Sequence, residues 1–349
     1  MKDRDKSKLW IKIVLSAFII IIILVVGVSF SYTYYQFNKV NTTVISKSDG
    51  DLGIMIEAPL KIDKNSRVKL EVPMQKEEVN EIINIALFGI DRRGVNEPSR
   101  SDSIMILSID KKHKKIKMSS IMRDTYVEIK NHGDTKINHA YAYGGAQLAI
   151  RTINENFNLD IRDYVMVDFF KLEKIIDTIG GVTIQVNQDE IELLNSYMIE
   201  VANIEKREVC EVTKSGLQTL NGLQAVAYSR IRYTVGGDFR RTERQRIVLS
   251  AMITKIQSLG IMEIPSVVSK ILPYTETSMK SMDIIKLGTM VLTSNITTLE
   301  QARFPLDGYC KGKIMDEVWY LIADMDATAD QLHNFIYEDI KPVPKASQF

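Results

Sequence analysis

The chain has 349 residues, of which 45% are hydrophobic and 26% charged, so it is long and apolar enough to bury a large core. Its 45 basic and 44 acidic residues give a formal charge of +1, which excludes a protein drawn to nucleic acid by its overall charge. The two cysteines and four histidines lack the spacing of a zinc site. Any anion-binding site must therefore be local.

The first 40 residues carry a membrane signal. Five basic residues among the first twelve precede an uncharged, apolar run from Ile13 to Phe30. As a helix, residues 13–32 would be about 30 Å long, the thickness of a hydrocarbon core. Trp10 and Tyr32 flank the run where aromatic belts form, and the basic end is expected to stay in the cytoplasm.

These features predict a cytoplasmic tail over residues 1–12, a single membrane-spanning signal-anchor helix over residues 13–32 and an extracytoplasmic remainder. The alternative is a cleaved signal peptide. Its apolar region would usually be shorter and would end in a small-residue cleavage site, which does not follow Phe30.

Residues 33–80 are polar and predict a stalk or accessory segment, with one possible edge strand in the alternating stretch Ser66–Val72. From residue 81 to about residue 340, β-branched apolar runs alternate with segments of helical period, which indicates one layered α/β domain. The predicted strands are 82–90, 103–109, 115–121, 164–169, 182–186 and 302–306, and the predicted helices are 144–156, 170–179, 221–229 and 242–259.

Arginines are concentrated in one short segment. Six of them fall within seventeen residues, namely Arg230, Arg232, Arg240, Arg241, Arg244 and Arg246. Arg230 and Arg232 can point the same way only in an extended chain, whereas Arg241, Arg244 and Gln245 share one face of a helix. Guanidinium groups donate in a planar fork that matches phosphate oxygens, so the two sets could converge on a pyrophosphate. The alternative is a solvated helix face with ordinary ion pairs.

Two aspartates lie beside neighbouring predicted strands. Asp91 follows strand 82–90 and Asp102 precedes strand 103–109, while Arg123 follows strand 115–121. Such carboxylates suit Mg²⁺, although either residue alone would be a common turn or cap residue. The sequence contains no P-loop, no G-x-S-x-G and no H-E-x-x-H motif. Carboxylates, arginines and a metal ion are the parts of a phosphoryl-transfer site.

Seven ordered blocks of this sequence resemble the LytR-CpsA-Psr family of cell-wall polymer ligases. They are Gly89–Arg93, Arg100–Ser103, Ser120–Thr125, Lys136–Gly145, Gly180–Val182, Tyr228–Arg232, and the set Asp238, Arg241, Arg244 and Gln245. The resemblance covers about residues 82–257 and is weaker beyond them. Met122 departs from the pattern, because the family usually has proline at this position.

The resemblance implies a mixed central sheet with helices on both faces and an apolar channel for a polyprenyl tail. It also implies a Mg²⁺-dependent phosphotransferase, with Mn²⁺ as an alternative ion. The enzyme would move a glycopolymer, such as teichoic acid or capsule, from undecaprenyl pyrophosphate to peptidoglycan in a Gram-positive-type wall.

The same resemblance implies the roles of individual residues. Asp91 and Asp102 would hold the metal ion, and together with Arg123 they would form the catalytic group. We expect the pyrophosphate to be surrounded by Arg93, Arg100, Arg123, Arg230, Arg232, Asp238, Arg241, Arg244 and Gln245.

Two other functions remain open at this point. Water could replace the acceptor hydroxyl, which would make the protein a polyprenyl-pyrophosphate hydrolase, or the chain could be a non-enzymatic, membrane-bound lipid sensor or regulator. Cys210 and Cys310 are expected to form a disulfide, because two solitary cysteines outside the cytoplasm often pair.

Overall fold

The computed structural model describes residues 40–55, 60–62, 69–71, 81–91, 99–205, 208–233, 236–260, 263–294 and 296–346. The predicted cytoplasmic tail and membrane-spanning helix, residues 1–32, lie outside these ranges. Among the described residues no helix is long and apolar enough to cross a membrane.

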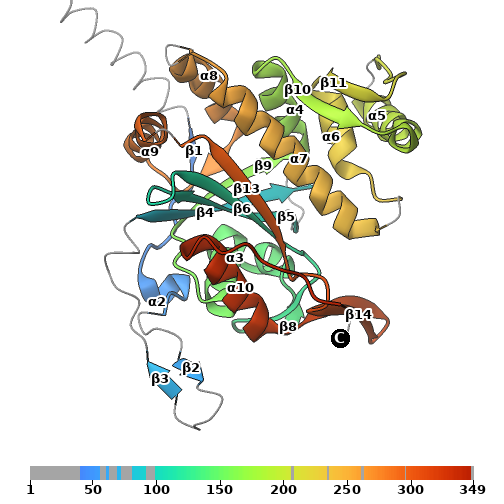
Figure 1. Ribbon diagram of the computed structural model, residues 1–349. Coiled ribbons are helices and arrows are strands. Elements are labelled where there is room, and N and C mark those ends of the chain that lie inside the picture. The colour runs from blue at the N-terminus through green and yellow to red at the C-terminus, as the bar shows by residue number, and fades with distance from the viewer. Residues whose placement is uncertain are drawn as a thin grey trace, which may run out of the picture.

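A seven-stranded mixed sheet forms the centre of the molecule, with the strand order β1-β12-β9-β4-β5-β6-β13 (Figure 1). In that order the strands are Asn41–Thr42, Glu276–Thr277, Asp163–Asp168, Ile82–Ile90, Ser101–Asp110, Lys115–Ile121 and Thr298–Phe304. The neighbours β4, β5 and β6 are antiparallel, whereas β9 runs parallel to β4 and β13 parallel to β6. Consequently β4, β6, β9 and β13 all end at the edge where β5 begins. We call this the Arg123 edge, and the opposite one the Lys117 edge.

Helices cover both faces of this sheet, which confirms the predicted α/β architecture. On one face α3 (His139–Phe157) and α10 (Met325–Tyr337) share a core with β4, β5 and β6. On the other, α7 (Gly237–Gln257) and α9 (Ser281–Thr293) pack against apolar residues of β4, β5, β6 and β13. Because both faces are buried, β4 reads as a nearly continuous apolar run.

A second group of elements, which we call the helix lobe, has its own apolar core. It consists of α4 (Phe169–Thr178), β10 (Val182–Val186), α5 (Ile191–Glu205), β11 (Gly216–Leu220) and α6 (Gly222–Arg230). The predicted strand 182–186 therefore exists, but it pairs with β11 and does not join the central sheet. Gly181 precedes β10 at φ +86°, and a Cβ there would lie 2.7 Å from the Leu220 carbonyl oxygen, so this connection requires glycine.

Two β-hairpins extend from the Arg123 edge. The first, β7 (Tyr126–Ile129) with β8 (Gly133–Lys136), follows β6, and the second, β14 (Cys310–Met315) with β15 (Val318–Ala323), follows β13. A parallel bridge between Thr125 and Leu321 joins them. The remaining elements are α2 (Asp49–Leu52), β2 (Leu60–Ile62), β3 (Lys69–Glu71), α8 (Ile264–Ile271) and the 3-10 helices Gln188–Glu190 and Leu272–Tyr274.

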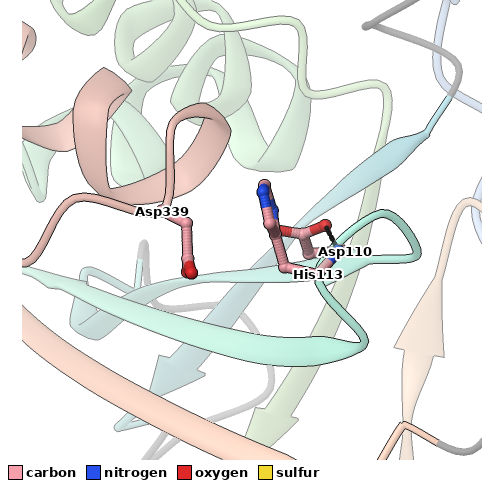
Figure 2. Close-up of side chains that lie close together, drawn as sticks. All are labelled: Asp110, His113 and Asp339. Carbon is pink, nitrogen blue, oxygen red and sulfur yellow. Dashed lines mark hydrogen bonds and ion pairs between the residues drawn. The ribbon is translucent and has the colours of Figure 1, made fainter.

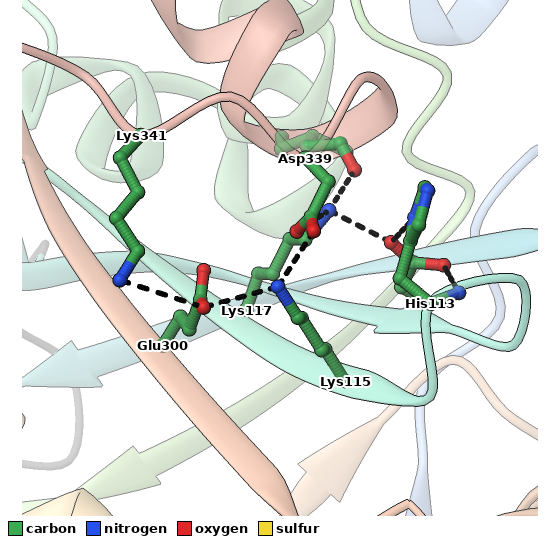
Figure 3. Close-up of polar contacts among 8 residues, drawn as sticks. His113, Lys115, Lys117, Glu300, Asp339 and Lys341 are labelled. Atoms are coloured by element: carbon green, nitrogen blue, oxygen red, sulfur yellow. Dashed lines mark hydrogen bonds and ion pairs between the residues drawn. The ribbon is translucent and has the colours of Figure 1, made fainter.

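At the Lys117 edge, side chains from three segments form a buried ion cluster (Figure 3). Lys117 is fully buried, and its Nζ donates to Asp110 Oδ2 at 2.7 Å and to the Ile336 carbonyl oxygen at 2.9 Å. Asp339 Oδ1 lies 3.2 Å from the same ammonium, and Asp339 Oδ2 lies 2.6 Å from Lys115 Nζ. This cluster ties β5 and β6 to the chain that follows α10.

The structure also bears on two other expectations, the segment before the domain and the disulfide. The segment 40–55, part of the predicted stalk or accessory segment, packs onto the domain, since β1 pairs with β12 and Leu52 is fully buried in the main core. The predicted disulfide is wrong, because Cys210 and Cys310 are both free. Cys210 lies between α5 and β11, where its carbonyl oxygen accepts from Gln224 Nε2 at 3.0 Å, whereas Cys310 opens β14, which lies well away from β11 in Figure 1.

Candidate functional site

A cavity of about 190 Å³ lies at the Arg123 edge, between the strand ends and the helix lobe. Its lining is mostly polar and combines carboxylates, guanidinium groups and aromatic rings. The lining residues are Asp91, Asp102, Phe169, Tyr197, Glu200, Arg230, Arg232, Tyr233, Arg241 and Gln245.

The two aspartates reach this pocket because β4 and β5 are neighbours. Ile90 pairs with Ser101 and Gly89 with Ser103, so Asp102 is the extra residue of a β-bulge at the start of β5, while Asp91 directly follows the adjoining end of β4. Their side chains remain 23% and 19% exposed, respectively. The structure therefore brings both residues into one cleft, as their positions beside neighbouring strands predicted.

Arg230 and Arg232 also line the pocket, but not from one extended segment. Arg230 is the last residue of α6, and the chain leaves the helix at Ile231 (φ −56°, ψ 122°), which lets Arg232 reach the same cavity. The Arg230 guanidinium lies 5.6 Å from the centroid of the Phe169 ring and 5.8 Å from that of Tyr197. Contacts of this kind hold a cation over aromatic faces.

Helix α7 supplies Arg241 and Gln245, which are four residues apart and share one face. Arg241 Nη2 lies 2.9 Å from Asp238 Oδ1, so Asp238 orients Arg241 without itself lining the cavity. Burial lowers the pKa of Arg241 to about 10, with help from Arg123 and Arg232 and against the effect of Asp238. This guanidinium remains charged at neutral pH.

Arg123 stands behind the pocket wall at the end of β6. It pairs with Asp102, and its Nη2 and Nε lie 3.5 Å from Asp238 Oδ1 and from Asp124 Oδ2. Burial alone would lower the pKa of Arg123, but the carboxylates of Asp238, Asp102 and Asp124 raise it overall. Arg123 is thus a fixed positive charge that orients Asp102.

Besides Arg123 and Asp238, two further described residues that were predicted to bind the pyrophosphate, Arg244 and Arg100, are absent from the lining of this pocket. Arg244 is buried, and its Nε lies 2.7 Å from Glu190 Oε1 while its Nη1 donates to the Ile231 carbonyl oxygen at 3.2 Å. It therefore fixes α7 against the chain that follows α6. Arg100 is exposed and outside the lining. It lies near His139, whose imidazole pKa is lowered mainly by burial and further by the charge of Arg100. Arg93 lies outside the described residues.

Four lining residues were not foreseen from the sequence, namely Phe169, Tyr197, Glu200 and Tyr233. Phe169 directly follows β9, which ends at the same edge as β4, so its position in the chain was a usable signal. Tyr197 and Glu200 lie three residues apart on α5 and carry no motif. Only the packing of the helix lobe brings them to the cavity.

Two sets of described residues could hold a metal ion. Asp110, His113 and Asp339 present ligand atoms within 4.8 Å of one another, and Figure 2 shows the Asp339 carboxylate across from the other two residues. The Lys117 ammonium already contacts both of these carboxylates, so it supplies the cation there. Asp91 and Asp102 instead face an open cavity with room for phosphates and water, which fits the hard oxygen ligands and incomplete protein shell of Mg²⁺.

Comparison with known proteins agrees with this geometry. Residues 54–335 match the model of the LytR_cpsA_psr family. The chain is 32% identical over 283 residues to the polyisoprenyl-teichoic acid–peptidoglycan teichoic acid transferase TagU of Bacillus cereus, a match that covers 79% of this chain and 84% of that protein. It is also 32% identical over 209 residues to the regulatory protein MsrR of Staphylococcus aureus, with 59% of each chain covered.

Solved structures with the same fold include TagT of B. subtilis, with a TM-score of 0.58, 26% identity, and 81% of this chain and 98% of that one covered. A structure described as TagT with bound octaprenyl pyrophosphate lipid has a TM-score of 0.56 and 25% identity, with the same coverage of the two chains. The sequence match across most of the chain shows that this protein belongs to the LytR-CpsA-Psr family.

Proposed function

We propose that this protein is a phosphotransferase that moves a glycopolymer from a polyprenyl pyrophosphate carrier to peptidoglycan. The observation that carries the proposal is the convergence of Arg230, Arg232 and Arg241 with Asp91 and Asp102 in a single cavity. The relatives support it, since TagU is named as a teichoic acid transferase and one TagT structure holds a polyprenyl pyrophosphate.

Donor binding follows from the charges of the lining. Arg230, Arg232 and Arg241 each present a fork of N–H donors that matches phosphate oxygens, and Gln245 adds a neutral donor. The rings of Phe169 and Tyr197 line the cavity and pack against the apolar core of the helix lobe. We propose that these rings contact the first carbon units of the lipid.

Asp91 and Asp102 would hold a Mg²⁺ ion, or Mn²⁺ in its place, which supplies positive charge to the phosphates. In the transfer, the acceptor hydroxyl oxygen bonds to the phosphorus that carries the sugar, and the bond from that phosphorus to the bridging oxygen breaks. Polyprenyl phosphate leaves, and one carboxylate of the aspartate pair takes the hydroxyl proton. Arg123 keeps Asp102 in position, and the pocket arginines stabilise the charge on the phosphates.

The location we propose is the cell membrane. A single N-terminal helix would anchor the chain, with the N-terminus in the cytoplasm and the pocket outside. The charge bias of the first twelve residues and the apolar run that follows them support this arrangement.

The deciding experiment uses the full-length protein in detergent with a lipid-linked saccharide, peptidoglycan fragments and Mg²⁺. Transfer by Asp91→Asn and Asp102→Asn should fall by about 10²–10³-fold, the usual effect of removing one group that stabilises charge in a transition state. Chelation of divalent cations should abolish transfer by the wild type. Asp330→Asn, an exposed position on α10, is the matched control and should behave as wild type.

Lipid release without transfer would identify a hydrolase. Donor binding without either reaction would support the sensor or regulator. Full transfer by both aspartate variants would show that the metal and catalytic assignments are wrong.

A further inference from the structure

Three side chains of the two hairpins form a partly exposed surface, which we call the tyrosine ledge: Tyr126, Lys136 and Tyr320. Tyr126 opens β7 and pairs across the hairpin with Lys136. The rings of Tyr126 and Tyr320 meet edge to face with centroids 5.1 Å apart, and Lys136 Nζ lies 5.7 Å from the centroid of Tyr320. All three are half-buried, so each is held by packing while part of it remains accessible.

A chain of contacts connects this ledge to the pocket. Lys136 Nζ lies 2.8 Å from Asp124 Oδ1, and the other oxygen of Asp124 is 3.5 Å from Arg123 Nε. Arg123 in turn pairs with Asp102, which lines the cavity. A backbone hydrogen bond adds a second link between the hairpin and Asp124, because Leu321 N donates to the Asp124 carbonyl oxygen at 2.9 Å. The ledge is therefore fixed relative to Asp102.

The ledge differs from the donor side of the pocket. The cavity's lipid-facing rings come from the helix lobe, whereas the ledge belongs to hairpins that follow β6 and β13 (Figure 1). In Figure 1, β8 and β14 lie well away from α5 and β10 of the lobe. A second substrate that approached over the ledge would reach Asp102 without crossing the site assigned to the lipid.

The chemistry around the ledge selects the kind of ligand. Lys313 lies across the hairpin from Tyr320, and Glu128 pairs with Asp134 next to Tyr126 and Lys136; all three of these neighbours are exposed. A lipid surface or the centre of a protein interface calls for a broad apolar face with few charges. A sugar ring has an apolar C–H face and polar edges, which fit tyrosine rings bordered by charged groups.

We propose that the tyrosine ledge binds the acceptor glycan, a chain of β-linked N-acetylated amino sugars, and leads its hydroxyl toward Asp91 and Asp102. This inference rests on the proposed transfer, which requires a sugar acceptor beside the donor pocket. The ring faces hold the sugars, and the Lys136 ammonium offers a donor to a carbonyl or hydroxyl oxygen of the chain.

The test uses chitohexaose, a phosphate-free chain of six β-linked N-acetylglucosamines, titrated calorimetrically into the full-length protein in detergent. Tyr126→Leu and Tyr320→Leu keep apolar volume but remove the flat ring, and each should weaken chitohexaose binding about tenfold. Tyr320→Phe should bind as wild type. Trp319→Leu is the matched control, because Trp319 lies on the opposite face of the same hairpin, paired with Ile314, and it should also leave binding unchanged.

Donor affinity is measured on the same variants with polyprenyl pyrophosphate and with a sugar-linked donor, and it should stay within twofold of wild type. The proposal is overturned if the wild type does not bind chitohexaose or if both Leu variants bind it normally. It is equally overturned if they lose affinity for either donor to the same extent, which would place the ledge on the donor side. Ledge-dependent chitohexaose binding without any transfer would instead reject the proposed function and leave the ledge assignment standing.

Discussion

Both edges of the central sheet carry basic side chains paired with aspartates, but these pairs have different roles at the two edges. At the Lys117 edge one fully buried ammonium donates to the Asp110 carboxylate and to the Ile336 carbonyl oxygen, and it lies 3.2 Å from Asp339 Oδ1. At the Arg123 edge, Arg123 pairs closely with Asp102, whereas Arg230 lies 4.0 Å from Asp91, beside an open cavity. Close partners around a buried charge stabilise the fold, whereas the longer Arg230–Asp91 contact leaves the Arg230 guanidinium able to bind a ligand in the cavity.

Strands β5 and β6 carry both arrangements. Asp110 and Lys117 lie near one end of this strand pair, and Asp102 and Arg123 lie at the other. The difference comes from what covers each edge, because the chain after α10 closes the Lys117 edge with Asp339 while the helix lobe leaves a cavity at the Arg123 edge. Substitutions at the two edges should therefore affect different properties.

The largest expected effect is on stability at the Lys117 edge. Lys117→Met removes the cation from the buried Asp110 carboxylate and should lower the free energy of unfolding by about 3–5 kcal/mol, measured by urea denaturation. Lys115→Met, whose ammonium is partly exposed, should cost about 1 kcal/mol or less and serves as the control. Equal stability of Lys117→Met and wild type would show that the cluster does not stabilise the fold.

A smaller effect, on binding only, is expected at the Arg123 edge. Arg230→Lys and Arg232→Lys keep the charge but lose the planar fork, so affinity for polyprenyl pyrophosphate should fall about tenfold in each. The urea midpoint should stay unchanged. Arg240→Lys, at an exposed position paired with Glu243, is the control. Unaltered affinity in both pocket variants would mean that these arginines form only a solvated surface.

The smallest effect concerns pH. Burial raises the pKa of Asp339, but hydrogen bonds and charge from Lys115 and Lys117 lower it overall. For Asp110, burial also raises the pKa, and the hydrogen bonds from Lys117 and His113 lower it overall. A lowered folded-state pKa contributes stability that is present above the unfolded value, about 3.9, and is lost as the pH falls through the folded value. Asp339→Asn should therefore flatten the acid side of the stability profile, measured by urea denaturation from about pH 6 downward. Parallel profiles for variant and wild type would contradict this.

Local sequence pattern was sufficient for much of the fold. Strands 82–90 and 115–121 agree with β4 and β6 at both ends, and β4 is an apolar run bounded by the charged residues Glu81 and Asp91. Helix α7 begins at Gly237, five residues before the predicted start, because a glycine pair resembles a loop when viewed without its surroundings. The pairing of β10 with β11 could not be predicted, since strand pattern identifies a strand but not its partner across thirty residues.

The site, like the fold, was predictable from the sequence only in part. Asp91 and Asp102 were predictable because strand ends that are close in sequence are also close in space. Arg244 has the same residue type and helix face as Arg241, yet a buried Glu190 from another segment takes it away from the cavity. Tyr197 and Glu200 come from a helix that has no motif, so only tertiary packing reveals them.

The proposed membrane anchor would give the strand order a direction relative to the bilayer. If residues 13–32 span the bilayer, the eight residues before β1 reach at most about 29 Å. This short tether starts at one end of the sheet, because β1 is its first strand and β13 its last. Six strand spacings of about 4.8 Å separate them, or about 29 Å. The sheet would then act as a spacer, with its β1 end near the lipid headgroups, the pocket midway and the hairpins projecting toward the wall.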